Sequence, residues 1–550
     1  MKKYLVILAF LAFSTTLLQA QTVNEKKIAS FPELKSVDAY SFRFDAKTET
    51  YFYSAYDTTT QKYTVYSNKG NSKQYGSIDD YSGIIDKNGN YYVTANNSVD
   101  TVYTYYILKN GIEIVSYEYI DPMWSEKDGI IYFSCKDSGK HYFVEYNTSD
   151  GSSKKSTAYD DIFFVYYPIT YYDSEPIGTI GFTPDGKTYY AASLNNERFL
   201  VIGGVEQKYY SDIDMYTFMP DKNGVLTYFA KDKGKFYEEK GNSFVVQGDK
   251  EYKKFDYVYG PLLFDNNNTP IYIAGDSAGG YIYPQRVVIG STEGKTYTSG
   301  IYDIKVTPKG KLAYVASNVI NADAGTYESY LVIDGKEGKR YRYISYVSFL
   351  SDGTPVYFGN KGENKPGVIV KGTEETPIEY PDIYELKVLE NGELSYVEVK
   401  YGNYEKKQKD KYRVVIGDKA FGPYDGMVSM YWNNGAYVLT DKDGNYAYIS
   451  MKLLDAGNYT YENRLYTNTG KSKTSEFFEN VYLFKGKALF AISKLKDKIN
   501  YIYDYQLYYG NKQIGSVYSS ITDFKLDEKS STATFKAVKG KDLYFVEVKF

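Results

Sequence analysis

The chain has 550 residues and carries 65 basic and 69 acidic side chains, which gives a formal net charge of −4. Charges of both signs are interspersed, so the charge pattern gives no electrostatic case for a nucleic-acid partner. Cys135 is the only cysteine, which excludes an intramolecular disulfide and requires a packed core. The chain has 68 tyrosines, and tyrosine favours β-strands while keeping a polar tip.

The N-terminal segment, "MKKYLVILAFLAFSTTLLQA", has the pattern of a secretory signal peptide. Lys2 and Lys3 form a charged start, an apolar run follows, and the small residue Ala20 precedes the predicted cleavage point. The apolar run is too short for a membrane anchor, and no later stretch approaches the length of a membrane span. We therefore expect residues 1–20 to be removed and the mature chain to be periplasmic or extracellular.

A repeated unit follows in chain order. Residues 180–193, "IGFTPDGKTYYAAS", read as an apolar strand, a turn with Asp185 and Gly186, and a second apolar strand. Asn268 stands where the turn glycine of one unit would be, and divergent segments at the two ends bring the total to about twelve units. Related segments recur about every 44 residues, with turn glycines at Gly89, Gly129, Gly186, Gly224, Gly310, Gly353, Gly392, Gly435 and Gly486.

Each unit has a second half of the same kind. Residues 329–344, "SYLVIDGKEGKRYRYI", read as a strand, a turn at Asp334 and Gly335, and another strand. No amphipathic helical pattern of useful length appears outside the signal segment. Four short antiparallel strands in about 40–45 residues are typical of a β-propeller blade, so we predict an all-β propeller fold with about twelve four-stranded blades.

Two of these segments resemble known propeller repeats. The stretch "FTPDGKTYYAAS" resembles the blade motif of the TolB-type and WD-repeat-like propellers of bacterial envelopes. The stretch "VIDGKEGKRY" is similar to units of exported propellers from Bacteroidetes. The resemblance covers nearly all of residues 30–550, and its motifs are structural, so it implies a propeller fold and no particular activity.

Twelve blades exceed the four to eight that are typical of one propeller. We therefore expect two propellers of about six blades each, at residues 21–300 and 301–550. The last unit supplies only three strands before Phe550, and residues 27–38, "KIASFPELKSVD", could supply the missing outer strand. In that case the C-terminal strands would close the first propeller.

The most enzyme-like feature is the string glycine–any–serine–any–glycine around Ser277. In α/β-hydrolases this serine lies on a strained turn between a strand and a helix, whereas Ser277 is predicted on a hairpin loop of a blade. A nucleophilic serine also needs a general base, and the only histidine, His141, lies three blades away in sequence. Cys135 and His141 flank another hairpin, where a buried strand cysteine explains the pattern. We predict no catalytic residue.

Metal and cofactor sites have weak signals. Asp441, Asp443 and Asn445 in "DKDGN" resemble the opening of a calcium loop, but the later glutamate and the full spacing are absent. Asp212 and Asp214 alternate at a predicted strand end. Neither a phosphate loop nor a dinucleotide fingerprint occurs. We therefore interpret these carboxylates as turn or solvated residues and expect no metal and no cofactor.

The connections between second and third strands are long in the second half of the chain, at residues 318–329, 401–411, 452–463 and 494–505. In a propeller these connections open on one face, where we expect a partner to bind. The alternative is that several fold back as strand ends. Exposed tyrosines suit recognition of peptides or sugars, and the predicted binding residues are Tyr327, Tyr401, Tyr404, Tyr459, Tyr461 and Tyr501.

Three tripeptides resemble the aspartate–hydroxyl–small-residue sites of O-glycosylation in Bacteroidetes exports. They are "DTT" at 57–59, "DTV" at 100–102 and "DSA" at 276–278. All three fall on the same class of predicted loop. The candidate acceptors are Thr58, Thr101 and Ser277.

The leading functional prediction is a non-catalytic exported propeller that binds a protein, peptide or glycan of the cell envelope. It follows from the blades, which leave no residues for a catalytic domain. One alternative is a propeller-class enzyme, a glycan lyase or hydrolase, which a cluster of two or three carboxylates with tyrosine or arginine at one ring centre would favour. The other alternative is a structural spacer.

Overall fold

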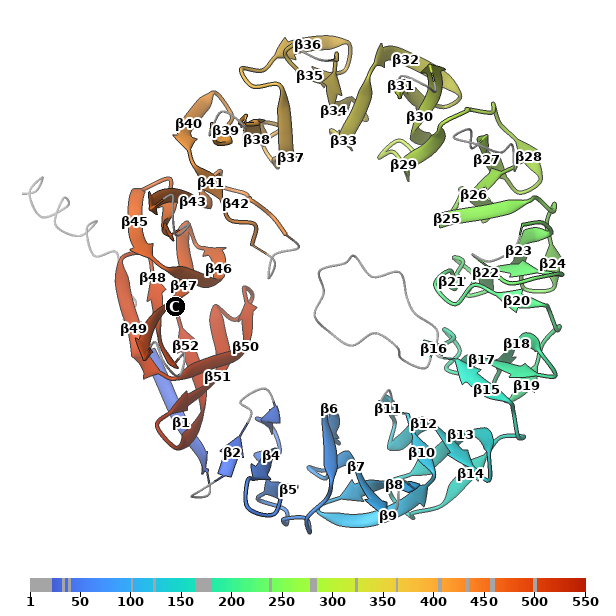
Figure 1. The fold of residues 1–550 in the computed structure, drawn as a ribbon, viewed down its shortest axis with the longest axis vertical. Coiled ribbons are helices and arrows are strands. Elements are labelled where there is room, and N and C mark those ends of the chain that lie inside the picture. The colour runs from blue at the N-terminus through green and yellow to red at the C-terminus, as the bar shows by residue number, and fades with distance from the viewer. Residues whose placement is uncertain are drawn as a thin grey trace, which may run out of the picture.

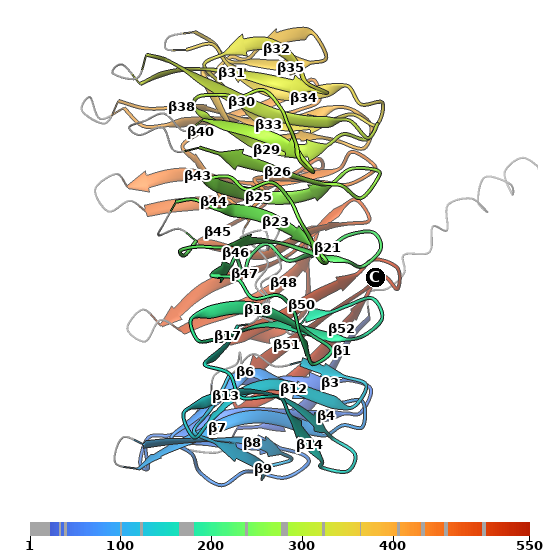
Figure 2. The ribbon, with the colours of Figure 1, turned by 90° about the vertical axis from the view of Figure 1, so that its right-hand side faces the viewer.

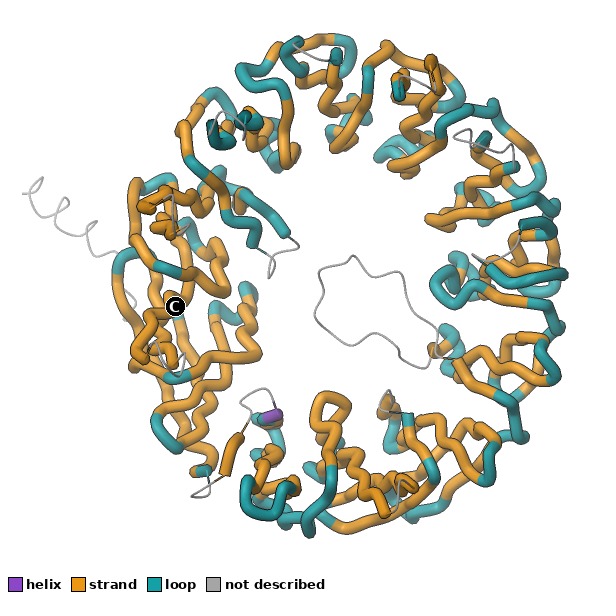
Figure 3. Tube along the Cα trace, viewed as in Figure 1, coloured by secondary structure: helices purple, strands orange, loops and turns teal. Residues whose placement is uncertain are grey.

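The computed structural model describes residues 22–31, 35–37, 41–99, 102–121, 125–163, 181–236, 240–276, 284–321, 325–362, 365–403, 408–430, 435–455, 460–497 and 502–550. Antiparallel strands joined by turns make up almost all of this part of the chain (Figure 3). The strands form twelve sheets, which we number as blades 1 to 12 in chain order. The predicted all-β propeller fold with about twelve blades is confirmed.

The blades follow one another along the chain, each running from its inner strand to its outer strand. Blades 1 to 4 contain β2 Lys35–Val37, β3 Arg43–Asp45, β4 Thr50–Asp57 and β5 Lys62–Ser67; β6 Ser77–Ile85, β7 Tyr91–Val99, β8 Val102–Lys109 and β9 Ile112–Tyr117; β10 Tyr119–Ile120, β11 Ser125–Lys127, β12 Ile130–Asp137, β13 Lys140–Asn147 and β14 Ser153–Lys155; and β15 Asp161–Phe163, β16 Gly181–Phe182, β17 Thr188–Leu194, β18 Glu197–Ile202 and β19 Val205–Glu206.

Blades 5 to 8 contain β20 Asp212–Ile213, β21 Met219–Pro220, β22 Leu226–Lys231, β23 Ser243–Gln247 and β24 Lys250–Glu251; β25 Tyr257–Phe264, β26 Pro270–Gly275, β27 Gln285–Ile289 and β28 Thr292–Glu293; β29 Gly300–Val306, β30 Leu312–Asn321, β31 Thr326–Ile333 and β32 Lys336–Tyr341; and β33 Tyr343–Phe349, β34 Pro355–Asn360, β35 Val368–Lys371 and β36 Glu374–Pro377.

Blades 9 to 12 contain β37 Asp382–Val388, β38 Leu394–Lys400, β39 Lys411–Ile416 and β40 Lys419–Tyr424; β41 Gly426–Met427, β42 Val438–Thr440, β43 Tyr446–Asp455, β44 Thr460–Thr467 and β45 Gly470–Ser475; β46 Phe477–Phe484, β47 Lys487–Asp497, β48 Ile502–Tyr509 and β49 Lys512–Tyr518; and β50 Ser520–Asp527, β51 Thr532–Lys539, β52 Asp542–Lys549 and the N-terminal strand β1 Thr22–Ser30.

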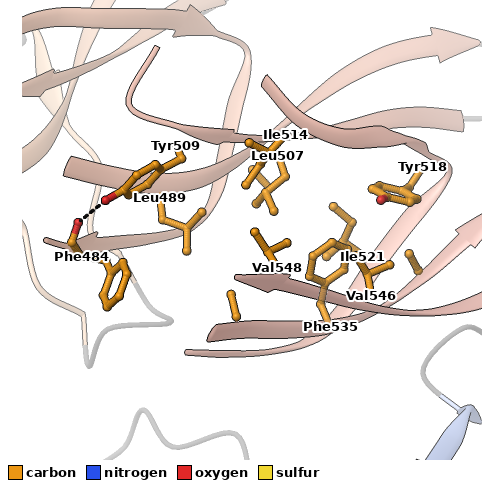
Figure 4. Packing of buried hydrophobic residues seen from close by; sticks show 13 residues of the cluster. Phe484, Leu489, Leu507, Tyr509, Ile514, Tyr518, Ile521, Phe535, Val546 and Val548 are labelled. Atoms are coloured by element: carbon orange, nitrogen blue, oxygen red, sulfur yellow. Dashed lines mark hydrogen bonds between the residues drawn. The ribbon is translucent and has the colours of Figure 1, made fainter. Parts of the chain in front are cut away.

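The blades stand round one ring, not two (Figure 1). A separate cluster of buried apolar side chains lies between each blade and the next, and one of them joins blade 12 to blade 1. Figure 4 shows the cluster between blades 11 and 12, where Leu507 packs with Phe535 and Val546. The expectation of two six-bladed rings is therefore wrong. The position 300–301 lies at the start of β29, the inner strand of blade 7, whose side chains share one cluster with those of blade 6.

The N-terminal strand closes the ring at the outer edge of blade 12. β1 pairs with β52 from Thr22↔Lys549 to Ser30↔Asp542, and the Ser30 hydroxyl donates to the Asp542 carboxylate at 2.7 Å. The prediction that an N-terminal segment supplies the missing outer strand is confirmed for residues 27–30, whereas Lys35–Val37 of the predicted segment form β2, an inner strand of blade 1. The strand begins at Thr22, earlier than the expected residue 27, because its antiparallel pairing with β52 starts at Thr22↔Lys549.

The inner strands are irregular in every blade. In blades 1, 3, 4, 5 and 10 the inner strand is divided into two pieces that both pair with the second strand. In the other blades the register shifts partway along the inner strand. Such bulges change the direction of a side chain, and four of them hold a residue in the left-handed region, namely Asp303, Tyr346, Asn480 and Asp523.

Two faces of the ring differ in their connections. The turns between inner and second strands are tight, and Asn268 has a φ of 64° at the position where other turns have glycine. In blade 10 this turn contains Gly444, and Gly435 instead lies between the two pieces of the inner strand. The prediction of Gly435 as a turn glycine is therefore wrong. The opposite face carries the connections between second and third strands, and we call it the hairpin face (left in Figure 2).

The long loops predicted on the hairpin face are mostly extended hairpins. In blade 7, β30 and β31 pair as far as Asn321↔Thr326. In blade 10, β43 and β44 pair as far as Asp455↔Thr460, and blade 11 has a similar hairpin. In blade 9, β38 ends at Lys400 and β39 begins at Lys411, and the described residues between them form no strand. The alternative that these segments fold back as strand ends therefore holds for most of them. No helix in the described residues has the length and apolar character needed to cross a membrane.

Candidate binding surface on the hairpin face

The structure describes three of the predicted binding tyrosines, and each lies on a different blade. Tyr327 is exposed on β31 of blade 7, and Tyr461 is half-buried on β44 of blade 10 opposite Leu453. Tyr401 is exposed after β38 of blade 9, and its hydroxyl donates to Asp382 at 3.3 Å. The tyrosines therefore share a face but form no single site. The other three, Tyr404, Tyr459 and Tyr501, lie outside the described residues.

Of the candidate glycosylation acceptors, Thr58 is exposed on the hairpin between β4 and β5. The backbone N–H groups of Thr59 and Thr60 donate to the Asp57 carboxylate at 2.9 and 3.3 Å, which fixes this turn. Thr101 and Ser277 lie outside the described residues. O-glycosylation at Thr58 thus stays a prediction, and the residue is exposed as an acceptor would need to be.

The candidate nucleophile and metal residues have structural partners. Cys135 is fully buried in the cluster between blades 2 and 3, and this burial raises its thiol pKa to about 12. Asp441 accepts the backbone N–H groups of Asp443 and Asn445 at 3.0 and 2.9 Å, as expected for a turn aspartate. Asp212 pairs with Arg198 at 2.5 Å. Within the described ranges no cluster of three or more potential metal-ligating residues occurs.

A groove of about 910 Å³ lies on the hairpin face at the junction of blades 7 and 8. Its walls come from the hairpin of blade 7, the outer strand of that blade and the hairpin of blade 8. Tyr327, which sequence reasoning selected, is one of its lining residues. The remaining lining residues are Ile320, Thr326, Glu328, Lys339, Arg340, Tyr341, Arg342, Lys361, Gly362, Lys365 and Glu375.

Positive charge exceeds negative charge in this groove, since five basic side chains and two carboxylates line it. Glu375 accepts from Lys361 at 2.6 Å and Tyr341 at 2.8 Å, and Lys339 lies 3.2 Å away. These donors, with the Lys361 hydrogen bond as the largest cause, lower the Glu375 pKa to about 2. Glu328 accepts from the Tyr330 hydroxyl. Arg340 also lies 3.5 Å from Glu328, so both carboxylates are engaged, and the five basic side chains leave the groove with a net positive charge.

Sequence reasoning missed the basic residues of the groove. They come from "GKRYR" at the end of blade 7 and "NKGENK" in blade 8. Each segment is unremarkable as a surface stretch, and only the ring geometry places them side by side. A local excess of lysine and arginine at a connection between blades is the signal that could have indicated them.

Exposed apolar side chains lie at the tips of three separate hairpins on the same face. Ile320 at the end of β30 is 63% exposed, and Leu454 near the end of β43 is 61% exposed. In blade 2, Val99 and Val102 at the facing ends of β7 and β8 are 72% and 68% exposed. Exposed apolar residues beside polar ones mark protein interaction surfaces when they recur on one face. The hairpin face therefore combines apolar tips with a basic groove.

Comparisons with known proteins assign the chain to no family. No family model matches the chain, and no curated protein matches its sequence. Among solved structures, TolB from Acinetobacter baumannii is 14% identical over 58% of this chain and 78% of that chain, with a TM-score of 0.20. The β-propeller domain of the Trilobed protease from Pyrococcus furiosus is 10% identical over 55% of this chain and 96% of that chain, with a TM-score of 0.24.

An oligogalacturonate lyase in complex with manganese is also similar, at 9% identity over 78% of this chain and 98% of that chain, with a TM-score of 0.25. The β-propeller fold of this chain is established by its own twelve blades. The function has to be argued from the residues of this chain.

Proposed function

We propose that the chain is a non-catalytic recognition protein of the cell envelope whose hairpin face binds a protein partner. The basic groove between blades 7 and 8, beside the apolar hairpin tips, is the observation that carries this proposal. Tyr327 lies in the groove and Ile320 at its margin, so the charged and apolar parts of the surface are continuous there. The signal-peptide pattern of residues 1–20 supports the location.

Apolar tips favour a protein over a glycan as the partner. A sugar chain is bound by aromatic faces and hydrogen bonds, whereas exposed aliphatic side chains gain free energy by contact with other apolar side chains. Ile320, Leu454, Val99 and Val102 are aliphatic and project from three different blades. Because these blades lie at separate positions round the ring (Figure 1), only Ile320, which lines the groove, is adjacent to the basic side chains there.

The test compares two matched sets of substitutions in the mature chain, residues 21–550. The first set, Val99→Ser, Ile320→Ser and Leu454→Ser, changes the hairpin face. The control set, Ile112→Ser and Val205→Ser, changes residues of the opposite face that are 70% and 63% exposed. Each immobilised protein is used to capture a partner from an envelope fraction, and the affinity of the purified partner is then measured by calorimetry.

We expect the hairpin-face set to weaken the partner's affinity by at least about tenfold and the control set to leave it unchanged. Equal loss in both sets, or no loss in either, contradicts the proposal. If the wild-type protein captures no partner at all, the chain is better described as a structural spacer.

One observation favours a glycan-active enzyme as a second candidate. Asp382 and Glu385 lie with several tyrosines on the inner strands of blades 8 to 10. A glycosidase needs two available carboxylates, but Glu385 is held by Lys387 at 2.6 Å and by the N–H of Val438 at 3.0 Å. One carboxylate remains, so we place recognition before catalysis. Turnover of a glycan by the wild type that is lost in Asp382→Asn would reverse this order.

A further inference from the structure

A cluster of tyrosines surrounds one carboxylate, Asp382, on blades 8 to 10. The inner strands β33 and β37 lie next to each other in the ring (Figure 1). Tyr346 stands at the bulge of β33 with a φ of 56° and is 39% exposed. The left-handed region is unfavourable for a bulky residue. Here the bulge turns this aromatic side chain out of the regular strand pattern.

Aromatic rings continue from Tyr384 on the neighbouring strand β37. The ring centroid of Tyr384 is 6.4 Å from that of Tyr401, 5.6 Å from that of Tyr412 and 5.7 Å from that of Tyr437. These rings come from three segments of blade 9 and from the segment before β42 of blade 10. Tyr401 is 52% exposed, so the cluster is accessible to a ligand.

Asp382, the first residue of β37, lies among these rings. Its carboxylate accepts the N–H of Ile383 at 2.8 Å and the hydroxyl of Tyr401 at 3.3 Å. Burial and then the proximity of Asp382 raise the pKa of Tyr346 to about 12. The Tyr343 pKa is also raised by burial, and then by a hydrogen bond to Asp382. The hydroxyls of Tyr401 and Tyr343 therefore both donate to this carboxylate, and Tyr346 stands on the adjacent inner strand β33.

No lysine, arginine or histidine within the described ranges forms a salt bridge with Asp382. The nearby Glu385 differs, because Lys387 neutralises it and the N–H groups of Tyr437 and Val438 donate to it at 3.4 and 3.0 Å. Asp382 thus contributes a negative charge that aromatic rings surround and that no cation of the described chain balances.

We propose that this cluster binds an organic cation, and specifically a methylated ammonium group held over the rings of Tyr346, Tyr384 and Tyr401 beside Asp382. A cation within about 6 Å of a ring centroid is attracted by the negative face of the ring, and several rings around one position add their effects. A carboxylate at the edge of such a cage supplies the opposite charge.

A methylated ammonium fits better than a primary one. A primary ammonium needs hydrogen-bond acceptors for its three N–H groups, but Asp382 already accepts from a backbone N–H and from tyrosine hydroxyls. A quaternary ammonium has no N–H donor and interacts through charge and methyl contacts alone, which aromatic faces provide. This proposal is independent of the protein partner proposed for the hairpin face.

The experiment is a calorimetric titration of the mature full chain with three probes. Choline carries the methylated ammonium, dimethylbutanol is its neutral carbon isostere, and an acetylated lysine amide carries a primary ammonium. We expect choline to bind, the neutral isostere to bind at least about tenfold more weakly, and the lysine derivative to bind more weakly than choline. Absence of choline binding, equal binding of the isostere, or tighter binding of the lysine derivative would each overturn the proposal.

Variants locate the site. We expect Tyr346→Ala to weaken choline binding about tenfold, Tyr346→Phe to preserve most of it because the ring remains, and Asp382→Asn to weaken it. The matched control is Tyr302→Ala, which removes an inner-strand tyrosine of blade 7 with 40% exposure. Binding that is equally reduced by Tyr302→Ala, or unaffected by Tyr346→Ala, contradicts the assignment. Circular dichroism of each variant establishes that the ring is folded.

Discussion

The outer and inner edges of the ring differ in how they connect neighbouring blades. At the outer edge a lysine and a tyrosine two residues apart on one blade contact a glutamate of the next blade. Examples are Lys73 and Tyr75 with Glu113, Lys208 and Tyr210 with Glu251, and Lys339 and Tyr341 with Glu375.

At the inner edge the contacts go from side chains to the backbone of the next blade. Lys305 donates to the carbonyl oxygen of Val347 at 2.6 Å, while the N–H of Val347 donates to Asp303 at 3.2 Å. Two blades later, Lys387 and Glu385 hold the C=O and N–H of Val438 in the same way, at 3.0 Å each.

This difference separates structure from function in the ring. Side-chain contacts at the outer edge require particular residues at a fixed spacing, so that edge repeats in the sequence. At the inner edge one acid and one lysine bind the backbone N–H and C=O of a residue in the next blade. The side chain of that residue can therefore vary. The bulges can therefore present different side chains, such as Tyr346, without loss of the connection. Changes at the two edges should therefore lower the stability of the ring by different amounts. The largest loss is expected from removing the strand that closes the ring.

Deleting residues 22–30 removes β1 from the outer edge of blade 12. The deletion leaves the backbone edge of β52 unpaired and uncovers apolar residues that pack with Val23. We expect a loss on the order of 5 kcal/mol in the free energy of unfolding, measured by urea titration, together with self-association in size-exclusion chromatography.

A synthetic peptide of residues 21–31 should restore the unfolding midpoint, and a scrambled peptide should not. If the deletion variant unfolds at the same urea concentration as the wild type, the N-terminal strand does not close the ring.

The repeat of four strands could be predicted from the sequence because each turn needs a residue that tolerates positive φ. Asn268 was found in this way, and its φ is 64°. The arrangement as one ring could not be predicted. The number of blades in a ring depends on the angle between neighbouring sheets, and side-chain packing between blades sets that angle. Gly435 was misassigned because it looks like a turn glycine although the inner strand is interrupted there.

For the candidate site, the sequence was enough to predict that Tyr327 and Tyr401 are exposed on one face of the ring. Their surroundings could not, because Tyr327 lies beside cations from two blades and Tyr401 contacts Asp382 of a preceding strand. The strain at Tyr346 has no sequence signal either, since tyrosine is common throughout the strands. It depends on a register shift that only the pairing of β33 with β34 defines.

The inner edge is tested by Glu385→Ala. This change leaves the buried N–H of Val438 without its acceptor and removes the partner of Lys387. We expect a loss of about 2–3 kcal/mol in the free energy of unfolding, measured by urea titration. Glu385→Gln, which keeps an acceptor oxygen, should lose less. The control is Glu390→Ala, an exposed residue of the same blade, and an equal loss in this variant contradicts the backbone contact.

The outer edge is tested by Glu375→Gln and its pH dependence. The Lys361 hydrogen bond, and then that of Tyr341, lower the Glu375 pKa from its ordinary 4.5 to about 2. Its stabilising effect is therefore complete above about pH 4.5 and is lost as the pH falls toward 2. We expect the variant to be less stable by about 1–2 kcal/mol at pH 7 and equal to the wild type near pH 2.

Glu374 is the matched control, since it lies on the same strand and is exposed. Glu374→Gln should change the unfolding temperature little at either pH. A pH-independent difference between Glu375→Gln and the wild type would show that the charge of Glu375 does not hold the two blades together.

The smallest effect concerns the strain at Tyr346. An alanine in the left-handed region is unfavourable by about 1–2 kcal/mol relative to the right-handed conformations, whereas glycine adopts either. We therefore expect Tyr346→Gly to be more stable than Tyr346→Ala by about 1 kcal/mol in urea titration. At Tyr302, which precedes a bulge but has no positive φ, the order should be reversed, because glycine weakens a strand interior. If the alanine variant is the more stable one at both positions, the bulge of blade 8 relaxes once the tyrosine ring is removed. The ring itself would then maintain the inner-edge conformation.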